Sequence, residues 1–399
     1  MMKNNIPRWW QTKKLGELCD VIAGQSPEGK FYNKSKKGLP FYQGKKEFGE
    51  KFIGEPKTWT TKITKEAQSG DILMSVRAPV GPVNFSTEKI CIGRGLAAIK
   101  IGKDIDKDFL FNFLQMFESK IIGNAGAVFN SINKYQIKNI EIPLPPLPEQ
   151  KCIVKILDEA FEKIEKGKEN TERNLKNSKE LFESYLQNVF ANDVAQKNLG
   201  DKNLFQIIDG DRGKNYPKKT DFYNEGYCLF LNTKNVRPNG FSLETKMFIT
   251  EAKDNLLGNG KLKRNDVLLT TRGTIGNIAV YDENVPFENI RINSGMLIFR
   301  PNTKLITPEY LFAVFQSGIM KSQIKQHVSG AAQPQLPIKT LVNFSIPVPK
   351  SVSEQKSIVK KLDALSEQTK KLEGVYKQKL ADLDELRKSV LKSAFAGKY

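Results

Sequence analysis

The residues best suited to chemistry in this sequence are basic and amide side chains near glycines. Arg77 and Arg272 each follow a strand-like run and precede a glycine, in GDILMSVRAPVG (70–81) and NDVLLTTRGTIG (265–276). A guanidinium at the end of a strand can bind guanine O6 and N7 together, or a phosphate. It could instead brace its own loop through backbone carbonyls. Because the arginine is present in both runs although their surroundings differ, we favour a phosphate or structural role over the reading of bases.

Further basic and amide residues follow the neighbouring strand-like runs. Two stretches of lysine and aromatic residues, at 30–37 and 212–219, suit loops that clamp a nucleic-acid backbone, although runs of charge are usually only solvated. Amides and lysines after the next run, including Asn232, suit the edges of adenine and guanine. The candidate DNA contacts are Lys30, Lys34, Lys36, Lys37, Gln43, Lys45, Lys46, Arg77, Arg94, Arg212, Lys214, Lys218, Lys219, Lys234, Asn235, Arg272 and Arg291.

The sequence offers little for catalysis or metal binding. It contains no GxxxxGK(S/T), HExxH or strand-led GxGxxG motif. His327 is the only histidine, so a histidine-based triad would have one member and no evident partner. The four cysteines stand singly, without the close pairs of zinc or redox sites. We therefore predict no catalytic residue, no metal site and no cofactor site in this chain.

The candidate residues recur because the chain is duplicated. The run EQKCIVKILD at 149–158 returns as EQKSIVKKLD at 354–363, and the register continues without a gap to Phe190 and Phe395. Repeats of solenoids and propellers are much shorter, roughly 20 to 50 residues. The long period therefore indicates the duplication of a whole globular part together with the helix that follows it.

Each copy ends in a stiff proline segment and a long amphipathic helix. IPLPPLP (142–148) and IPVP (346–349) favour extended backbone, and Ser351 with Glu354 fits a capping box. Apolar and small residues then recur at spacings of three and four, which is typical of a coiled coil. The predicted seams are Ile153, Leu157, Ala160, Ile164, Thr171, Leu175, Ser178, Phe182, Tyr185 and Val189, and Ile358, Leu362, Leu365, Thr369, Leu372, Tyr376, Leu380, Leu383, Val390 and Ala394.

These patterns predict an α+β fold in which two duplicated globular domains are separated by a long antiparallel two-helix coiled coil. Small residues in the first seam match larger ones in the second, which favours pairing of the two helices with each other. Packing of each helix on its own domain is the alternative. The predicted bounds are 1–148 and 198–350 for the domains, and 149–197 and 351–399 for the helices. Helical segments are expected inside the domains at 107–120 and 308–320.

The overall charge fits a partner rich in phosphate. The chain has 63 Lys and Arg against 44 Asp and Glu, a net charge of +19, and the excess lies in the globular parts rather than in the first long helix. A generally lysine-rich composition would also produce such surfaces. No apolar run of about 18 residues could cross a bilayer, and the N-terminus does not resemble a signal peptide. We therefore expect a cytoplasmic protein that does not enter membranes.

Several motifs in order identify a family. The combination of GQSP (24–27), PFYQGKKEFG (40–49), GDILMSVRAPVGPVN (70–84), CIGRGLAAI (91–99) and IPLPPLPEQKCIVKILD (142–158) closely resembles the specificity subunit of type I restriction-modification systems. The second half repeats the pattern in GDRGKNYP, NDVLLTTRGTIGN and IPVPKSVSEQKSIVKKLD. The resemblance covers essentially the whole chain. One departure is KSVSEQ in place of PLPEQ before the second helix.

The resemblance implies how the chain is used. The globular parts would be target-recognition domains, each reading one half of a bipartite sequence in double-stranded DNA, and the coiled coil would set the spacer between the halves. DNA methyltransferase subunits are expected to dock on the chain, and a restriction and translocase subunit to join them. S-adenosylmethionine and ATP would belong to those partners, so the chain would direct enzymes without being one. A structural coiled-coil adaptor and an enzyme with an unrecognised active site are the alternatives.

Overall fold

The computed structural model describes residues 6–123, 131–191, 194–328 and 334–399. The chain divides into two compact units, of which unit 1 is Met1–Glu172 with Gln378–Tyr399 and unit 2 is Arg173–Lys377. This division passes through both long helices, so each unit contains the beginning of one helix and the end of the other.

Unit 1 contains two sheets that share a core. An antiparallel sheet has the order β2 (Cys19–Ala23), β10 (Leu96–Ile101), β7 (Ile72–Ser75) and β8 (Val83–Phe85). The other sheet has the order β3 (Tyr32–Asn33), β5 (Trp59–Thr60), β4 (Leu39–Tyr42), β9 (Ile90–Ile92) and β6 (Glu66–Ala67), with β4 and β9 parallel. All of β7 is buried because Ile72 and Met74 pack with helix α2 (Lys107–Gly123) while Leu73 packs with Tyr42 of the second sheet.

Smaller elements complete unit 1. Strand β1 (Gln11–Lys14) pairs with β11 (Glu141–Leu144), and short helices α1 (Leu15–Leu18) and α3 (Lys134–Lys138) lie beside β2. The helix predicted at 107–120 is confirmed by α2. Single three-residue 3-10 turns follow β2 at Gly29–Phe31 and β4 at Lys45–Glu47.

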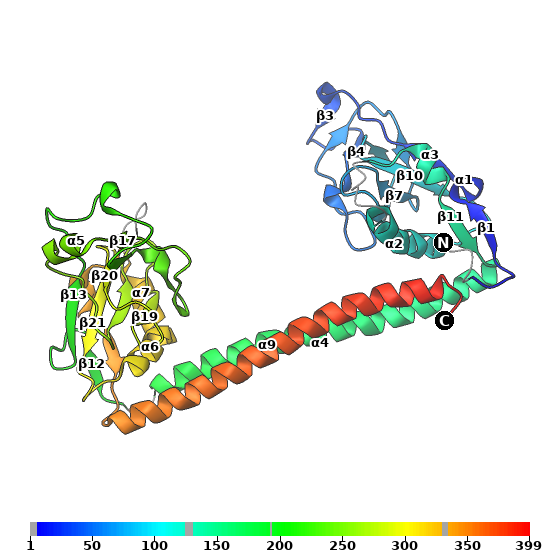
Figure 1. The fold of residues 1–399 in the computed structure, drawn as a ribbon. Coiled ribbons are helices and arrows are strands. Elements are labelled where there is room, and N and C mark those ends of the chain that lie inside the picture. Colours follow the sequence, from blue (N-terminus) through cyan, green and yellow to red (C-terminus); the bar gives the residue numbers. More distant parts are fainter. Residues whose placement is uncertain (1–5, 124–130, 192–193, 329–333) are drawn as a thin grey trace. The chain divides into compact units, whose positions relative to one another are not determined.

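Unit 2 repeats this plan (Figure 1). Its main sheet has the order β13 (Phe205–Asp209), β21 (Met296–Pro301), β18 (Val267–Thr270) and β19 (Ile278–Val280), and its second sheet has the order β17 (Phe248–Ile249), β14 (Cys228–Leu231) and β20 (Ile290–Ile292). Strands β14 and β20 are parallel, as β4 and β9 are in unit 1. The remaining elements are the pair β12 (Gln196–Asn198) and β22 (Ser345–Pro347), the hairpin β15 (Val236–Arg237) and β16 (Gly240–Phe241), helices α5 (Glu251–Leu256) and α8 (Ile338–Leu341), and 3-10 turns at Lys219–Asp221 and Thr233–Asn235.

The helical segment predicted at 308–320 is confirmed, but it is divided. The structure has two helices there, α6 (Pro308–Gln316) and α7 (Gly318–His327), which share the core on one face of the main sheet. Ser317 separates them because its backbone is extended and its hydroxyl accepts the N–H of Met320, which caps α7.

The two predicted long helices are confirmed as α4 (Leu147–Ala191) and α9 (Val352–Ala394). In unit 1, the Arg387 guanidinium lies over the Phe161 ring at 4.0 Å, and Lys168 forms an ion pair with Asp384 at 2.7 Å. An ideal Cβ on Gly167 would lie 3.5 Å from the Leu383 side chain. Since earlier residues of α4 meet later residues of α9, the pairing is antiparallel, as predicted. In unit 2, the end of α4 and the beginning of α9 share one core with α6.

The seam between the helices differs from the prediction in detail. Phe161 is buried whereas the predicted Ala160 is only partly buried, and Leu186 and Phe190 are buried in the core against which the predicted Tyr185 and Val189 pack while only partly buried. Leu372 is 43% exposed and lies outside the seam. A helix of 3.6 residues per turn drifts around its axis relative to a strict seven-residue pattern, so a seam extended by counting moves off the contact line.

Two equivalent glutamines of the repeated EQK run attach the long helices to the domains. In unit 1, the buried Gln150 accepts the Asp106 N–H at 2.7 Å and donates to the Pro145 carbonyl at 2.9 Å. In unit 2, the buried Gln355 accepts the Thr307 N–H at 2.9 Å and donates to the Leu305 carbonyl at 2.9 Å. Each glutamine therefore binds the backbone immediately before the helix, α2 or α6, that packs on the main sheet. Across the described ranges, no helix is both long and apolar enough to cross a membrane.

Candidate nucleic-acid interface

The loops that leave the strands meet at one end of each unit. In unit 1, an ideal Cβ on Gly24 would lie 2.2 Å from the Gly93 carbonyl oxygen, and one on Gly95 would lie 2.5 Å from that of Gln43. In unit 2, a Cβ on Gly210 would lie 2.2 Å from the Asn293 carbonyl oxygen. Only glycine permits so close an approach, so these glycines bring the loops after β2, β4 and β9, and after β13, β14 and β20, together.

Gln43 is held in a defined orientation in the unit 1 cluster. The Ser26 hydroxyl donates to Gln43 Oε1 at 2.8 Å and accepts the Arg94 N–H at 3.2 Å. The amide oxygen accepts the Ser26 proton, and the NH₂ group of the exposed Gln43 side chain makes no hydrogen bond within the described part of the chain. The amide therefore offers hydrogen-bond donors to a ligand.

A small basic cavity adjoins this amide. Arg77, Arg94 and Lys134 line a cavity of about 250 Å³ together with the backbone around Ser131. Arg77 reaches it because its backbone bridges to Ser131 and Val76 bonds to Gly95. Within the described part of the chain, neither the Arg77 nor the Arg94 side chain makes a hydrogen bond or ion pair, so both guanidinium groups are available to an anion.

A second cavity in unit 1, of about 420 Å³, joins amide, cationic and aromatic groups. It is lined by Gln43, Lys45, Lys46 and Lys57, and on its wall the Tyr32 and Phe41 rings stack at 4.7 Å. The structure thus brings together five predicted residues, namely Gln43, Lys45, Lys46, Arg77 and Arg94. Lys57 and Lys134 were missed because neither stands next to a strand-like run or a glycine.

Unit 2 has a corresponding cluster. Asn232 follows β14 as Gln43 follows β4, and its Oδ1 accepts the Lys234 N–H at 2.8 Å. The Arg272 N–H donates to the Gly295 carbonyl at 3.2 Å, and the Arg272 side chain is exposed. Arg212 is partly engaged, because it pairs with Asp209 and donates to the Ser294 carbonyl at 3.3 Å. Each unit therefore has an amide residue, Gln43 or Asn232, and an exposed arginine, Arg77 or Arg272, at the ends of equivalent strands.

The remaining predicted lysines lie on exposed loops. Lys30 pairs with Glu28 at 2.6 Å, and Lys36 lies over the Trp59 ring at 5.8 Å. The other members are exposed, and they are Lys34, Lys37, Lys214, Lys218, Lys219 and Lys234. Tyr32 of the 30–37 stretch lines the second cavity, but none of these lysines lines either cavity, so their role as backbone contacts stays a prediction.

Arg291 and Asn235 are corrected, because neither can reach a ligand. Arg291 is 5% exposed, and its guanidinium binds the Asp254 carboxylate and three carbonyls, including that of Leu257 at 3.0 Å. The Asn235 amide is 1% exposed and donates to the carbonyls of Ser242 and Thr245. In the parallel strand pairs, Arg291 lies beside Phe230 of β14 much as Cys91 lies beside Phe41 of β4, so it is not the counterpart of Arg94.

The buried Asp254 explains why Arg291 is needed inside unit 2. Burial acts to raise the pKa of Asp254, but hydrogen bonds from Lys261 and Arg291 outweigh it and hold the pKa below its usual value. Lys261 lies 2.5 Å from the carboxylate. The two cations offset the cost of burying this carboxylate, and Arg291 links β20 to the loop around α5.

The comparisons with known proteins agree with this architecture. A family model described as type I restriction modification DNA specificity domain matches residues 7–172 and 192–381. The putative type I restriction enzyme MjaX specificity subunit of Methanocaldococcus jannaschii is 46% identical over 176 residues, which are 42% of this chain and 41% of that protein. The type I restriction enzyme EcoBI specificity subunit of Escherichia coli is 22% identical over 97% of this chain and 86% of the relative.

Two solved structures share the fold. A chain from work on complex assembly and conformational transition of the type I R-M system has a TM-score of 0.74 at 19% identity, with 99% of both chains covered. The HsdS subunit from Thermoanaerobacter tengcongensis has a TM-score of 0.64 at 19% identity, with 100% of both chains covered. Since the family model spans most of the sequence in two matched segments, the chain belongs to the family of type I restriction-modification DNA specificity subunits.

Proposed function

We propose that this chain is the non-catalytic reader of a bipartite DNA sequence for a type I restriction-modification complex. Each loop cluster would bind one half of the target, the antiparallel helices would set the unread spacer, and the same scaffold would dock DNA methyltransferase subunits. S-adenosylmethionine and ATP would be bound by the methyltransferase and by a restriction and translocase subunit. The observation that supports this proposal is the recurrence, in both units, of an amide whose oxygen accepts a hydrogen bond from the chain and of an exposed arginine, each at the end of an equivalent strand.

The division of labour within a cluster follows from its chemistry. Arg77 and Arg94 lie in one cavity with Lys134, and three neighbouring cations suit phosphate oxygens. Gln43 and the stacked Tyr32 and Phe41 line the other cavity, where hydrogen-bond donors and aromatic rings suit base edges. The arginines would therefore fix the position of the chain on the DNA backbone, while the amide would contact the base edges.

The orientation of the amides makes this proposal more specific. Gln43 Oε1 and Asn232 Oδ1 are both occupied by donors from the chain, at 2.8 Å in each case. An amide with both atoms free would pair with adenine N6 and N7, whereas one whose oxygen already accepts a hydrogen bond from the chain has NH₂ as its freer group and favours an acceptor. Each half-site would therefore present a major-groove acceptor, such as guanine O6 or thymine O4, to its amide.

The test is to co-express the chain with a type I methyltransferase subunit and to map the methylated bases in the host genome. A single motif interrupted by an unread spacer of constant length is expected. Methylation at a contiguous motif, or none with a correctly assembled complex, would contradict the proposal. The Gln43→Glu variant, which replaces donors by acceptors, is the internal control, because it should alter one half of the motif and leave the other unchanged.

A further inference from the structure

The two units differ at the free edge of the main sheet. Phe85 of β8 pairs with Ile72, and Val280 of β19 pairs with Val267 in the same register, so Val280 is the counterpart of Phe85. In unit 1, Phe85 stacks on Phe111 of α2 at 4.7 Å. The counterpart of Phe111 in α6 is Phe312, because each lies five residues after the backbone N–H that the attaching glutamine binds.

In unit 1, a neighbouring segment of the chain covers this edge. The Ile53 N–H donates to the Phe85 carbonyl at 3.0 Å, and the Phe85 N–H donates to the Lys51 carbonyl at 2.9 Å. The Phe52 ring lies 5.9 Å from that of Phe85, and Lys51 pairs with Asp108 of α2 at 3.0 Å. A cationic residue followed by an aromatic one thus lies along the sheet edge beside the helix, with the Phe52 ring covering Phe85 while remaining 54% exposed.

Unit 2 lacks both of these side chains. Phe48 and Val236 each directly follow the 3-10 turn after the equivalent strand, β4 or β14. Phe48 bridges to Ile53, and Val236 pairs with Phe241, so Phe241 is the counterpart of Ile53. Gly240, which precedes Phe241, is therefore the counterpart of Phe52. An ideal Cβ on Gly240 would meet nothing within 4 Å. Asn239 replaces Lys51, while Glu309 keeps the acidic character of Asp108. The receiving side is therefore preserved and the inserted side chains are missing.

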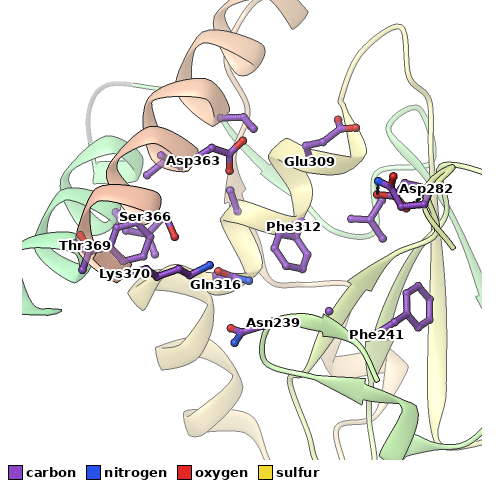
Figure 2. Close-up of a pocket in the computed structure, with 18 of the residues that line it drawn as sticks. Asn239, Phe241, Asp282, Glu309, Phe312, Gln316, Asp363, Ser366, Thr369 and Lys370 are labelled. Carbon is purple, nitrogen blue, oxygen red and sulfur yellow. Dashed lines mark hydrogen bonds between the residues drawn. The ribbon is translucent and has the colours of Figure 1, made fainter. Parts of the chain in front are cut away.

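An open cavity of about 650 Å³ lies beside this edge within unit 2. Figure 2 shows Phe312 at its centre, between Glu309 and Gln316 on α6, with Asp363, Ser366 and Lys370 of α9 along the opposite wall. We call it the edge slot and define it by six lining residues, the apolar Val280, Phe312, Ala313 and Val359 and the acidic Glu309 and Asp363.

We propose that the edge slot binds an extended segment of the methyltransferase subunit in which a cationic residue precedes an aromatic one. The aromatic ring would lie against Phe312 and Val280, as Phe52 lies against Phe85, and the cation would pair with Glu309 or Asp363. Burial of an aromatic side chain removes 150–250 Å² or so from water, which suits a cavity of this size. The proposal rests on the proposed function only in requiring that the chain has a methyltransferase subunit as its partner.

A second copy of this chain is a less suitable occupant. Its own cationic and aromatic pair, Lys51 and Phe52, is already held in unit 1 by two backbone hydrogen bonds and an ion pair. Those contacts would have to break before the pair could enter the slot of another copy. A partner subunit with a free extended segment would bind without that cost.

The first test uses a peptide probe with the sequence GEKFIG, which is residues 49–54 of this chain, on the intact protein. Fluorescence anisotropy should show one saturable site. Replacement of the peptide's phenylalanine by alanine, or of its lysine by glutamate, should weaken binding at least tenfold. Ala313→Trp fills the slot and should abolish binding, whereas Ala364→Trp, on the exposed face of α9, should not change it.

Glu309→Lys provides a second variant that does not depend on packing, because Glu309 is exposed. It should weaken the peptide at least threefold. Absence of peptide binding, or equal binding by the chain and by Ala313→Trp and Glu309→Lys, would overturn the proposal. Self-association of the chain that Phe52→Ala removes would also overturn it, since the occupant would then be a second copy.

The second test uses the methyltransferase subunit. Ala313→Trp should reduce its affinity for the chain at least tenfold while DNA binding by the chain alone is unchanged. Unchanged methyltransferase affinity would refute this subunit as the occupant. If the unsubstituted chain does not bind DNA, that result counts against the proposed function instead. Failure of the edge-slot proposal and failure of the proposed function are therefore distinguishable.

Discussion

Replacement of Gln355 by leucine should loosen the attachment of α9 to unit 2. The substitution removes the acceptor of the Thr307 N–H at 2.9 Å and the donor to the Leu305 carbonyl at 2.9 Å. Thr307 is 5% exposed, so its N–H would be left without this acceptor at a place that water hardly reaches. Leu305 is 45% exposed, and its hydrogen bond to Gln355 is only partly buried.

The expected loss of stability depends on how deeply the Thr307 N–H and the Leu305 carbonyl are buried. A buried donor without a partner costs about 1–3 kcal/mol, and a partly buried carbonyl costs less. The leucine side chain recovers part of this by burying apolar surface, at about 25 cal/mol per Å². We therefore expect the free energy of unfolding of unit 2 to fall by about 2 kcal/mol.

Urea denaturation of the intact chain, followed by circular dichroism, measures the loss. Hydrogen exchange at the amides of α6 then assigns it to unit 2. Gln368→Leu is the matched control, because it makes the same change on the same helix at an exposed position. It should change the free energy by no more than about 0.5 kcal/mol. If Gln355→Leu unfolds like Gln368→Leu, with unchanged exchange in α6, the buried glutamine does not attach the helix.

Three further outcomes follow from the interactions described above. The double variant Arg77→Gln and Arg272→Gln should weaken binding to all DNA sequences. It should also reduce the slope of log affinity against log salt concentration, measured by anisotropy titration, by about 1 for each phosphate that is no longer neutralised. Weaker binding confined to one base position would contradict the phosphate role. Gln43→Glu should replace an acceptor-bearing base of one half-site by a donor-bearing base such as cytosine, and an unaltered methylated motif would refute the assigned amide orientation. The pKa of Asp254 is lower in the folded chain than in the unfolded one, so its contribution to stability is present above about pH 4 and lost as the pH falls through the folded value. Urea midpoints should therefore decline below about pH 4 in the parent chain, while Asp254→Asn should be less stable at neutral pH and depend less on acid.

The large elements were predictable because their signals are long. The two helices repeat the same run and carry an apolar spacing through many turns, which is enough to predict both their existence and their antiparallel pairing. Individual contacts along them were not predictable, because a small rotation of each helix moves Leu372 out of the seam and Phe161 into it. The break at Ser317 depends on one hydroxyl cap within an otherwise helical pattern, and such local signals are weak.

The candidate site shows a similar limit. Arg77 and Arg94 were each identifiable from a strand end near glycines, but their common cavity depends on β10 lying between β2 and β7. Sequence order does not reveal that arrangement. Arg291 was misassigned because a basic residue near an asparagine and a glycine looks like a loop contact until the strand register shows that it pairs with the buried Asp254.

The two units share the contacts that attach them to the long helices, but they differ at the strand ends and at the sheet edge. The degree of burial explains both the shared and the differing contacts. Gln150 and Gln355 bind equivalent backbone groups, and Phe395 packs on Phe109 as Phe190 packs on Tyr310, so each unit is attached to the helices in one way. These groups are buried, and a change in one of them would leave a polar group or a cavity without compensation. The exposed strand ends and the free sheet edge carry no such penalty. Differences in recognition between the units can therefore accumulate there, at the amides and in the edge slot, without altering the attachment on which both units depend.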